Sequence, residues 1–214
     1  MKVKNKTIHQ IWFGGKKIPD FCNDYMEKIK NLGYNYKLWI DQDIDNSFKC
    51  FSIDRLITKS DLARFEILQR YGGLYLDIDI EVLGNIEHLF KEELHIAGET
   101  SRGQSDIYIV SSNPNNKEIQ KYIENVEIRW SNNILFSPLE TTGIKKIKKT
   151  INYNTYTEKD LKVIDHKCIH LWSFIERGWE YDSEFLLQQA CIRNDRYRER
   201  WTKNNRRNAK SRNL

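Results

Sequence analysis

The chain has 214 residues, of which 12% are aromatic and 30% charged, so it is long enough to bury a core and too aromatic to be disordered. Its net charge of +5 arises at the C-terminal end, because residues 193–214 carry nine basic and two acidic groups. The rest of the chain has 26 basic and 28 acidic groups, a net charge of −2. A body without excess positive charge argues against nucleic-acid binding, and the sequence has neither a membrane-spanning apolar run nor a secretory signal.

These features predict one domain over residues 1–202, followed at 203–214 by a basic tail or linker. The tail offers an alternative function, because a basic segment can bind an anionic surface or a nucleic acid. The four cysteines form no CxxC pair, which is typical of reduced thiols in a cytosolic compartment. They are Cys22, Cys50, Cys168 and Cys191.

The first predicted strand covers residues 7–13, TIHQIWF, which are rich in β-branched and aromatic side chains. It ends at Gly14 and Gly15, where the backbone can approach a ligand closely. Ligands of open α/β sheets bind at the carboxyl ends of the strands, so Trp12 is a candidate to stack on a nucleobase. Packing of Trp12 in the core is the alternative.

A helix is expected next, with Asp20 as its N-cap and Gly33 as its stop. Residues 34–40, YNYKLWI, then predict a second strand, which completes the strand–helix–strand unit of parallel sheets. The acidic residues 41–45 match a calcium loop at three positions, but the required Gly and terminal Glu are missing, so we expect a polar loop.

The most informative stretch covers residues 60–82 and predicts a helix, a double-glycine turn and a strand. Thr58 or Ser60 is the expected N-cap of the helix. Asp61 and Arg64 lie three residues apart and therefore share a helical face, where a surface ion pair is the simplest interpretation.

In the predicted strand from Leu74 to Val82, apolar side chains alternate with polar ones. The polar face would carry Tyr75, Asp77, Asp79 and Glu81. Several carboxylates on one face are unfavourable unless a cation or solvent compensates them, and hard divalent cations often share carboxylates with a substrate phosphate. Asp77 and Asp79 therefore predict a metal–diphosphate site, with a solvated acidic strand face as the alternative.

Beyond this stretch the patterns weaken. We expect strands at residues 95–98, 107–110 and 163–164, helices through residues 119–126 and 144–151, and a last helix from Ser183.

Three motifs, in order along the chain, carry a resemblance to a known family. They are Ile8-His9-Gln10-Ile11-Trp12-Phe13-Gly14-Gly15, Tyr36-Lys37-Leu38-Trp39, and Ser60-Asp61-Leu62-Ala63-Arg64 with Tyr71-Gly72-Gly73-Leu74-Tyr75-Leu76-Asp77-Ile78-Asp79. Over roughly residues 1–85 the chain resembles the DXD-containing sugar transferases of glycosyltransferase family 32, whose skeleton the clostridial glucosylating toxins share. The resemblance implies an α/β GT-A fold, in which helices flank a Rossmann-like, mixed, mostly parallel sheet. It also implies sugar transfer from a UDP- or GDP-sugar with retention at the anomeric carbon.

The resemblance further implies a catalytic set. Asp79 would be the direct ligand of Mn²⁺ or Mg²⁺ on the diphosphate, and Asp77 would hold the ribose, the sugar and a metal-bound water. Asp61 and Arg64 would hold hydroxyls of the donor sugar. The expected donor-binding residues are Trp12, Phe13, Gly14, Asp61, Arg64, Tyr75, Asp77 and Ile78.

In the family a C-terminal segment with His and Trp completes the metal site; here His170, with His166 as the alternative, would do so near Trp172. The acceptor would be a glycan or glycoprotein. A transferase of this size without an anchor resembles those with which large algal viruses, the chloroviruses, glycosylate their capsid protein. That likeness implies the cytoplasm, the host's if the protein is viral. The alternative on the same fold is a non-catalytic module that binds glycans or nucleotide sugars.

Overall fold

A computed structural model of the chain describes residues 6–97 and 107–166. Its main sheet has the strand order β2-β1-β3-β6-β5-β7, in which β6 alone runs against the other five described strands. The strands are β1 (Thr7–Ile11), β2 (Asn35–Trp39), β3 (Gly73–Leu76), β5 (His95–Ile96), β6 (Ile109–Ser112) and β7 (Asn154–Thr155). A second, antiparallel sheet pairs β4 (Ile80–Val82) with β8 (Ile164–His166). This is the mixed, mostly parallel sheet that the family resemblance implies.

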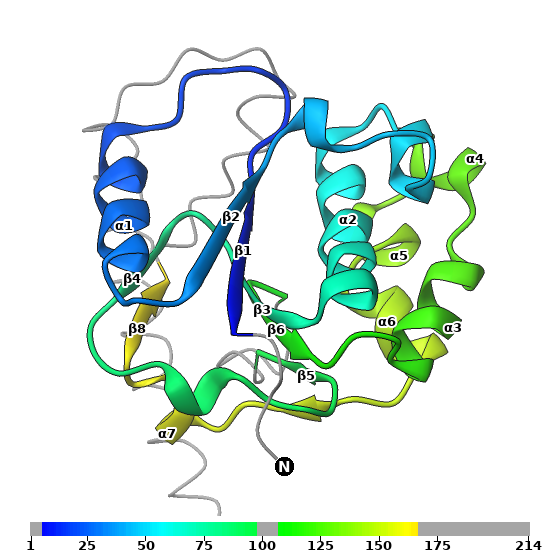
Figure 1. Ribbon diagram of the computed structural model, residues 1–214. Coiled ribbons are helices and arrows are strands. Elements are labelled where there is room, and N and C mark those ends of the chain that lie inside the picture. Colours follow the sequence, from blue (N-terminus) through cyan, green and yellow to red (C-terminus); the bar gives the residue numbers. More distant parts are fainter. Residues whose placement is uncertain (1–5, 98–106, 167–214) are drawn as a thin grey trace, which may run out of the picture.

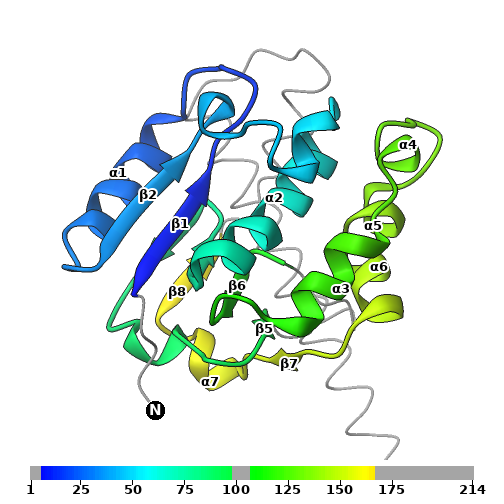
Figure 2. The ribbon, with the colours of Figure 1, turned by 45° about the vertical axis from the view of Figure 1, so that its right-hand side comes forward.

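Helices cover both faces of the main sheet. They are α1 (Asp20–Lys30), α2 (Leu56–Tyr71), α3 (Lys117–Asn125), α4 (Ile128–Ser131), α5 (Pro138–Thr141), α6 (Ile144–Thr150) and α7 (Glu158–Leu161), with 3₁₀ turns at Asp41–Asp43, Lys49–Ser52 and Glu87–Leu89. Helix α1 and the second sheet lie on one side, and α2 with α3, α5 and α6 lies on the other (Figures 1 and 2). Among the described helices, none is long and apolar enough to cross a bilayer.

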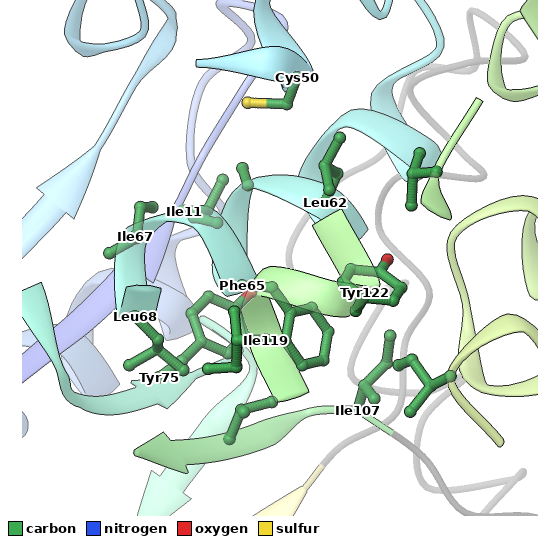
Figure 3. Packing of buried hydrophobic residues seen from close by; sticks show 14 of the residues in the cluster. Ile11, Cys50, Leu62, Phe65, Ile67, Leu68, Tyr75, Ile107, Ile119 and Tyr122 are labelled. Carbon is green, nitrogen blue, oxygen red and sulfur yellow. The ribbon is translucent and has the colours of Figure 1, made fainter. Parts of the chain in front are cut away.

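Alternate side chains of the strands enter two separate cores. Ile8 of β1 and Leu74 of β3 pack with Ile29 of α1. The larger core lies on the opposite face, where Phe65 of α2 packs against Tyr122 of α3 with ring centroids 4.6 Å apart (Figure 3). Both faces of the central strands are therefore buried, as is typical of a sheet covered by helices on both sides.

At the start of β3, the backbone of this strand lies very close to the backbone of β1. Gly73 has a φ of +102°, and a Cβ at this position would lie 2.4 Å from the Thr7 carbonyl oxygen of β1. Beside it, the buried His9 meets the Gly72 carbonyl through Nε2 over 2.9 Å, and its Nδ1 accepts from the Trp39 indole over 3.2 Å. Burial of this imidazole lowers its pKa to about 4. The neutral ring thus joins β1 and β2 to the turn that starts β3.

Two predicted helix starts are wrong. Helix α1 has Pro19 rather than Asp20 at its N-cap. Helix α2 begins at Leu56, ahead of both expected caps, because the hydroxyls of Thr58 and Ser60 donate backwards to carbonyls three residues earlier.

A single strand from Leu74 to Val82 is also wrong. Strand β3 ends at Leu76, residues 77–79 form a turn, and β4 leaves the main sheet to pair with β8. Asp is disfavoured inside strands and favoured in turns, so the two aspartates interrupt the ladder where the alternation alone would extend it.

Candidate functional site

Asp77, directly after β3, is held by both its backbone and its side chain. Its N–H donates to the Tyr108 carbonyl over 2.9 Å, and its own carbonyl accepts from the Gln10 amide over 3.2 Å. The Tyr75 hydroxyl donates to its Oδ1 over 2.6 Å, and Arg64 Nη1 lies 3.5 Å from the same oxygen. The carboxylate therefore has one defined position at the carboxyl edge of the sheet.

Asp79 lies in the same turn, with a side chain that is 8% exposed. Its Oδ1 is 3.4 Å from Nε2 of His166, the residue that ends β8 and pairs with Ile80 of β4. The Tyr108 ring stacks on the imidazole with centroids 4.1 Å and planes 25° apart. The second sheet thus brings a histidine from late in the chain to the aspartate turn.

Asp77, Asp79 and His166 form a cluster in which one possible ligand atom from each residue lies within 4.8 Å of the others. Burial raises the pKa of the Asp77 carboxyl, the Arg64 guanidinium opposes that rise, and the Asp79 carboxylate adds to it. A cation between the carboxylates would relieve their repulsion. Carboxylates suit Mg²⁺ and Mn²⁺ whereas imidazole is a ligand of transition metals, so the donor set fits Mn²⁺.

Asp61 and Arg64 of α2 form an ion pair over 3.2 Å, but not the surface pair that their spacing suggested. Their side chains are only 10% and 5% exposed. Arg64 also donates to the Ile107 carbonyl and lies with its guanidinium carbon 4.8 Å above the Tyr75 ring. One arginine therefore joins the helix carboxylate to Asp77 at the end of β3.

Thr142, directly after α5, is a site residue that the sequence patterns did not reveal. Its hydroxyl donates to Asp61 Oδ2 over 3.2 Å, and the residue is fully buried. Its carbonyl accepts from the Tyr122 hydroxyl of α3. Thr142 stands in a turn ahead of α6, and no local periodicity relates that turn to a residue on α2. The same is true of Tyr108, whose role depends on a ring contact across the fold.

Residues 6–96 match the family model described as the glycosyltransferase sugar-binding region containing the DXD motif. An uncharacterized glycosyltransferase of Acanthamoeba polyphaga mimivirus, L373, is 26% identical over 181 residues, which cover 76% of this chain and 71% of that protein. The chain is a glycosyltransferase. Asp77-Ile78-Asp79 stands in the matched region as its DXD motif.

One solved structure supports the fold of this glycosyltransferase. The PaToxG glycosyltransferase has a TM-score of 0.50 at 17% identity and covers 87% of this chain and 78% of its own. A glycosyltransferase involved in the glycosylation of the major capsid of PBCV-1 has a TM-score of 0.49 at 13% identity, over 81% of this chain and 99% of its own. The α/β fold class predicted from the resemblance is confirmed.

At the end of β1, the predicted donor-binding residues of the glycosyltransferase are largely enclosed. Trp12 is 4% exposed and donates from its indole to the Lys16 carbonyl over 2.7 Å, and Phe13 is fully buried. The Gly14 N–H donates to Asp41 Oδ2 over 2.7 Å. Core packing accounts for both rings in this conformation, and stacking of Trp12 on a nucleobase stays a prediction.

The remaining predicted donor-binding residues, Tyr75 and Ile78, are buried beside the aspartates. Glu81, the third acidic residue of the predicted strand face, is turned to α1, where Lys28 Nζ donates to it over 2.6 Å. His170 and Trp172 lie outside the described residues. Of the two histidine candidates for the metal site, His166 is the one that the described structure brings to the aspartate turn.

Proposed function

We propose that this glycosyltransferase moves a sugar from a UDP- or GDP-sugar to a glycan or glycoprotein acceptor in a reaction that depends on a divalent cation. The observation that carries the proposal is the cluster of Asp77, Asp79 and His166 at the carboxyl edge of the main sheet. Open α/β sheets bind their ligands at this edge, and a diphosphate needs positive charge beside it as it leaves.

Asp77, Asp79 and His166 would hold the cation, with Mn²⁺ as the better fit and Mg²⁺ as the alternative. The cation would act as a Lewis acid that neutralises the departing nucleoside diphosphate. His170, the ligand expected from the resemblance, would add to this set or replace His166.

Asp61 and Arg64 would hold the hydroxyls of the donor sugar. Their mutual pairing and the contacts to Thr142 and Ile107 keep both side chains in one position before a ligand arrives. A preorganised carboxylate and guanidinium reduce the entropy lost when the sugar is oriented toward the acceptor hydroxyl. No residue is assigned as a nucleophile, and retention at the anomeric carbon is taken from the family resemblance.

Two broader proposals follow from the viral likenesses. The mimivirus relative and the PBCV-1 neighbour support a role in viral glycosylation, with a capsid glycoprotein as the acceptor and the host cytoplasm as the location. We also propose that residues 1–202 form one catalytic domain and that residues 203–214 are a basic tail.

The deciding experiment replaces one carboxylate. Asp79→Asn removes the charge with little change of shape, so we expect manganese-dependent binding of a nucleotide sugar to weaken more than about 100-fold, since even outer-shell changes cost 10- to 100-fold. Isothermal calorimetry with UDP- and GDP-sugars, with and without Mn²⁺, measures this loss. The exposed Asp20→Asn serves as the matched control. Equal affinity of Asp79→Asn and wild type in Mn²⁺ would refute the metal site.

A further inference from the structure

Five large apolar side chains are exposed on α4, on α5 and on the segment that joins these two helices. Ile134 and Leu135 are 82% and 87% exposed. Single exposed apolar residues are normal on a protein surface, but a contiguous group of them marks an interaction site. We call the whole group the apolar lip. It comprises Trp130, Ile134, Leu135, Phe136 and Leu139.

The apolar lip is held outward by hydrogen bonds at its base. The Leu135 N–H donates to Asn133 Oδ1 over 2.9 Å, and the Phe136 carbonyl accepts from Arg55 Nη1 over 2.8 Å. Asn132 is tied to the segment ahead of α2, because it accepts from the Asp54 N–H and donates to the Ser52 carbonyl, each over 2.9 Å. The two most exposed side chains therefore project from an anchored turn, so little conformational entropy is lost when a partner covers them.

Positive charge lies beside the lip. Residues 127–150 contain five basic and two acidic groups, a net of +3. Helix α6 buries Ile144 and Ile147, and its charged side chains are all lysines. Its Lys146 lines the same hollow as Trp130 and Phe136, together with Glu127 and Glu140. Lys145 Nζ lies 3.3 Å from Glu140 Oε1, so the net positive charge beside the lip comes from the lysines that exceed these two carboxylates. Figures 1 and 2 both place α4, α5 and α6 along one margin of the molecule, opposite α1.

Three occupants other than lipid fit these residues less well. A sugar ring would need a free aromatic face, but the Trp130 ring is already in contact with two neighbours. The guanidinium carbon of Arg129 lies 4.5 Å from its centroid, and the centroid of the Phe136 ring lies 4.7 Å from it. Protein interfaces are depleted of Lys, and their hot spots seldom consist of Leu. A second copy placed lip to lip would bring the two lysine-bearing helices toward each other, and like charges repel.

We propose that the apolar lip inserts into the surface of an anionic membrane while the lysines of α6 contact the lipid headgroups. Peripheral membrane proteins combine the same two elements, an apolar group that enters the headgroup region and a basic patch that attracts anionic lipid. Neither element needs the donor site, so the proposal is independent of the proposed reaction.

Co-sedimentation with vesicles tests the proposal on the full chain. Wild-type protein should sediment with vesicles of phosphatidylcholine and phosphatidylserine, less with phosphatidylcholine alone, and less again at raised salt. Leu135→Asp should weaken binding to the mixed vesicles by about tenfold or more, because a charge replaces a side chain that would enter the lipid. The double variant Lys145→Gln/Lys149→Gln should remove most of the preference for phosphatidylserine.

Leu83→Asp is the matched control, since Leu83, directly after β4, is 61% exposed and belongs to no part of the lip. It should bind vesicles as wild type does. Failure of the wild type to sediment with the mixed vesicles, or equal binding of Leu135→Asp, would overturn the proposal. If the wild-type protein does not bind vesicles but forms a dimer that Leu135→Asp abolishes, the lip binds a second copy of the chain, and the membrane proposal is overturned as well.

Discussion

The two parts of the chain that build the site differ in how they reach it. Residues 60–79 bring Asp61, Arg64, Asp77 and Asp79 together through one helix, one turn and one strand that are contiguous in sequence. Residues 107–166 contribute a carbonyl and a stacked ring from the segment ahead of β6, a hydroxyl from the turn after α5 and an imidazole from β8. The first part carries the charges, and the second part determines where those charges point.

The family match follows the same division. It ends at residue 96, whereas Tyr108, Thr142 and His166 all lie beyond it. A residue that orients a carboxylate can be replaced by another donor from another direction, so its position is less constrained in sequence than that of the carboxylate itself. The comparison therefore predicts large effects in the contiguous part and smaller, more specific effects in the dispersed part.

The largest expected effect is on folding of the contiguous part. Gly73→Ala places a Cβ 2.4 Å from a backbone oxygen at a φ of +102°, so unfolding should become easier by about 3–5 kcal/mol. Gly15 also has a positive φ, but a Cβ at this position would meet no atom within 4 Å, so Gly15→Ala should lower the free energy of unfolding by only about 1 kcal/mol. Urea unfolding measures both. Equal losses would show that the approach of β3 to β1 is not close.

The next effect is a pH dependence. His9 has a pKa of about 4 when folded, so the unfolded chain, with a pKa near 6.5, binds more protons between these values. The stabilisation is fully present above pH 6.5 and falls as the pH drops toward 4, by about 2 kcal/mol between pH 7 and pH 5. His9→Gln should unfold more readily at pH 7 and lack this part of the slope. Urea midpoints at both pH values provide the measurement, and identical slopes in the two proteins would contradict it.

The third prediction concerns the dispersed part. His166→Ala should reduce Mn²⁺ affinity about 10- to 100-fold if the imidazole belongs to the metal site. His88→Ala, an exposed histidine that contacts the Asp160 carbonyl, is the control and should bind Mn²⁺ normally. Calorimetry with Mn²⁺ alone is sufficient. If His166→Ala binds Mn²⁺ as wild type does, the ligand comes from elsewhere, and His170 becomes the residue to test.

The smallest expected effect is also the most specific. Thr142→Val removes one hydrogen bond to the buried Asp61 carboxylate, so kcat/KM for the donor should fall about tenfold, mainly through KM. Thr142→Ser should restore it, because the hydroxyl returns. Thr141→Val is the neighbouring control, since its hydroxyl reaches only carbonyls at 3.4 Å. A loss that Ser does not rescue would mean a packing role instead.

The sequence by itself determined the local elements and the acidic motif. Period-two and helical patterns, double glycines and the Asp-Ile-Asp spacing all act over a few residues, so they predicted the first strand, the helices α1, α2, α3 and α6, and the two aspartates. Sequence reasoning was wrong where a local preference competed with tertiary pairing, as in the strand expected to run through Asp77 and Asp79.

Only the tertiary structure decided which distant groups complete the site. The pairing of β4 with β8 brings His166 to Asp79, and the burial of α2 under α5 brings Thr142 to Asp61. Contacts of this kind depend on how complete sheets and helices pack against one another in the tertiary structure. No periodicity within a segment records that packing, and so the sequence alone could not assign either residue.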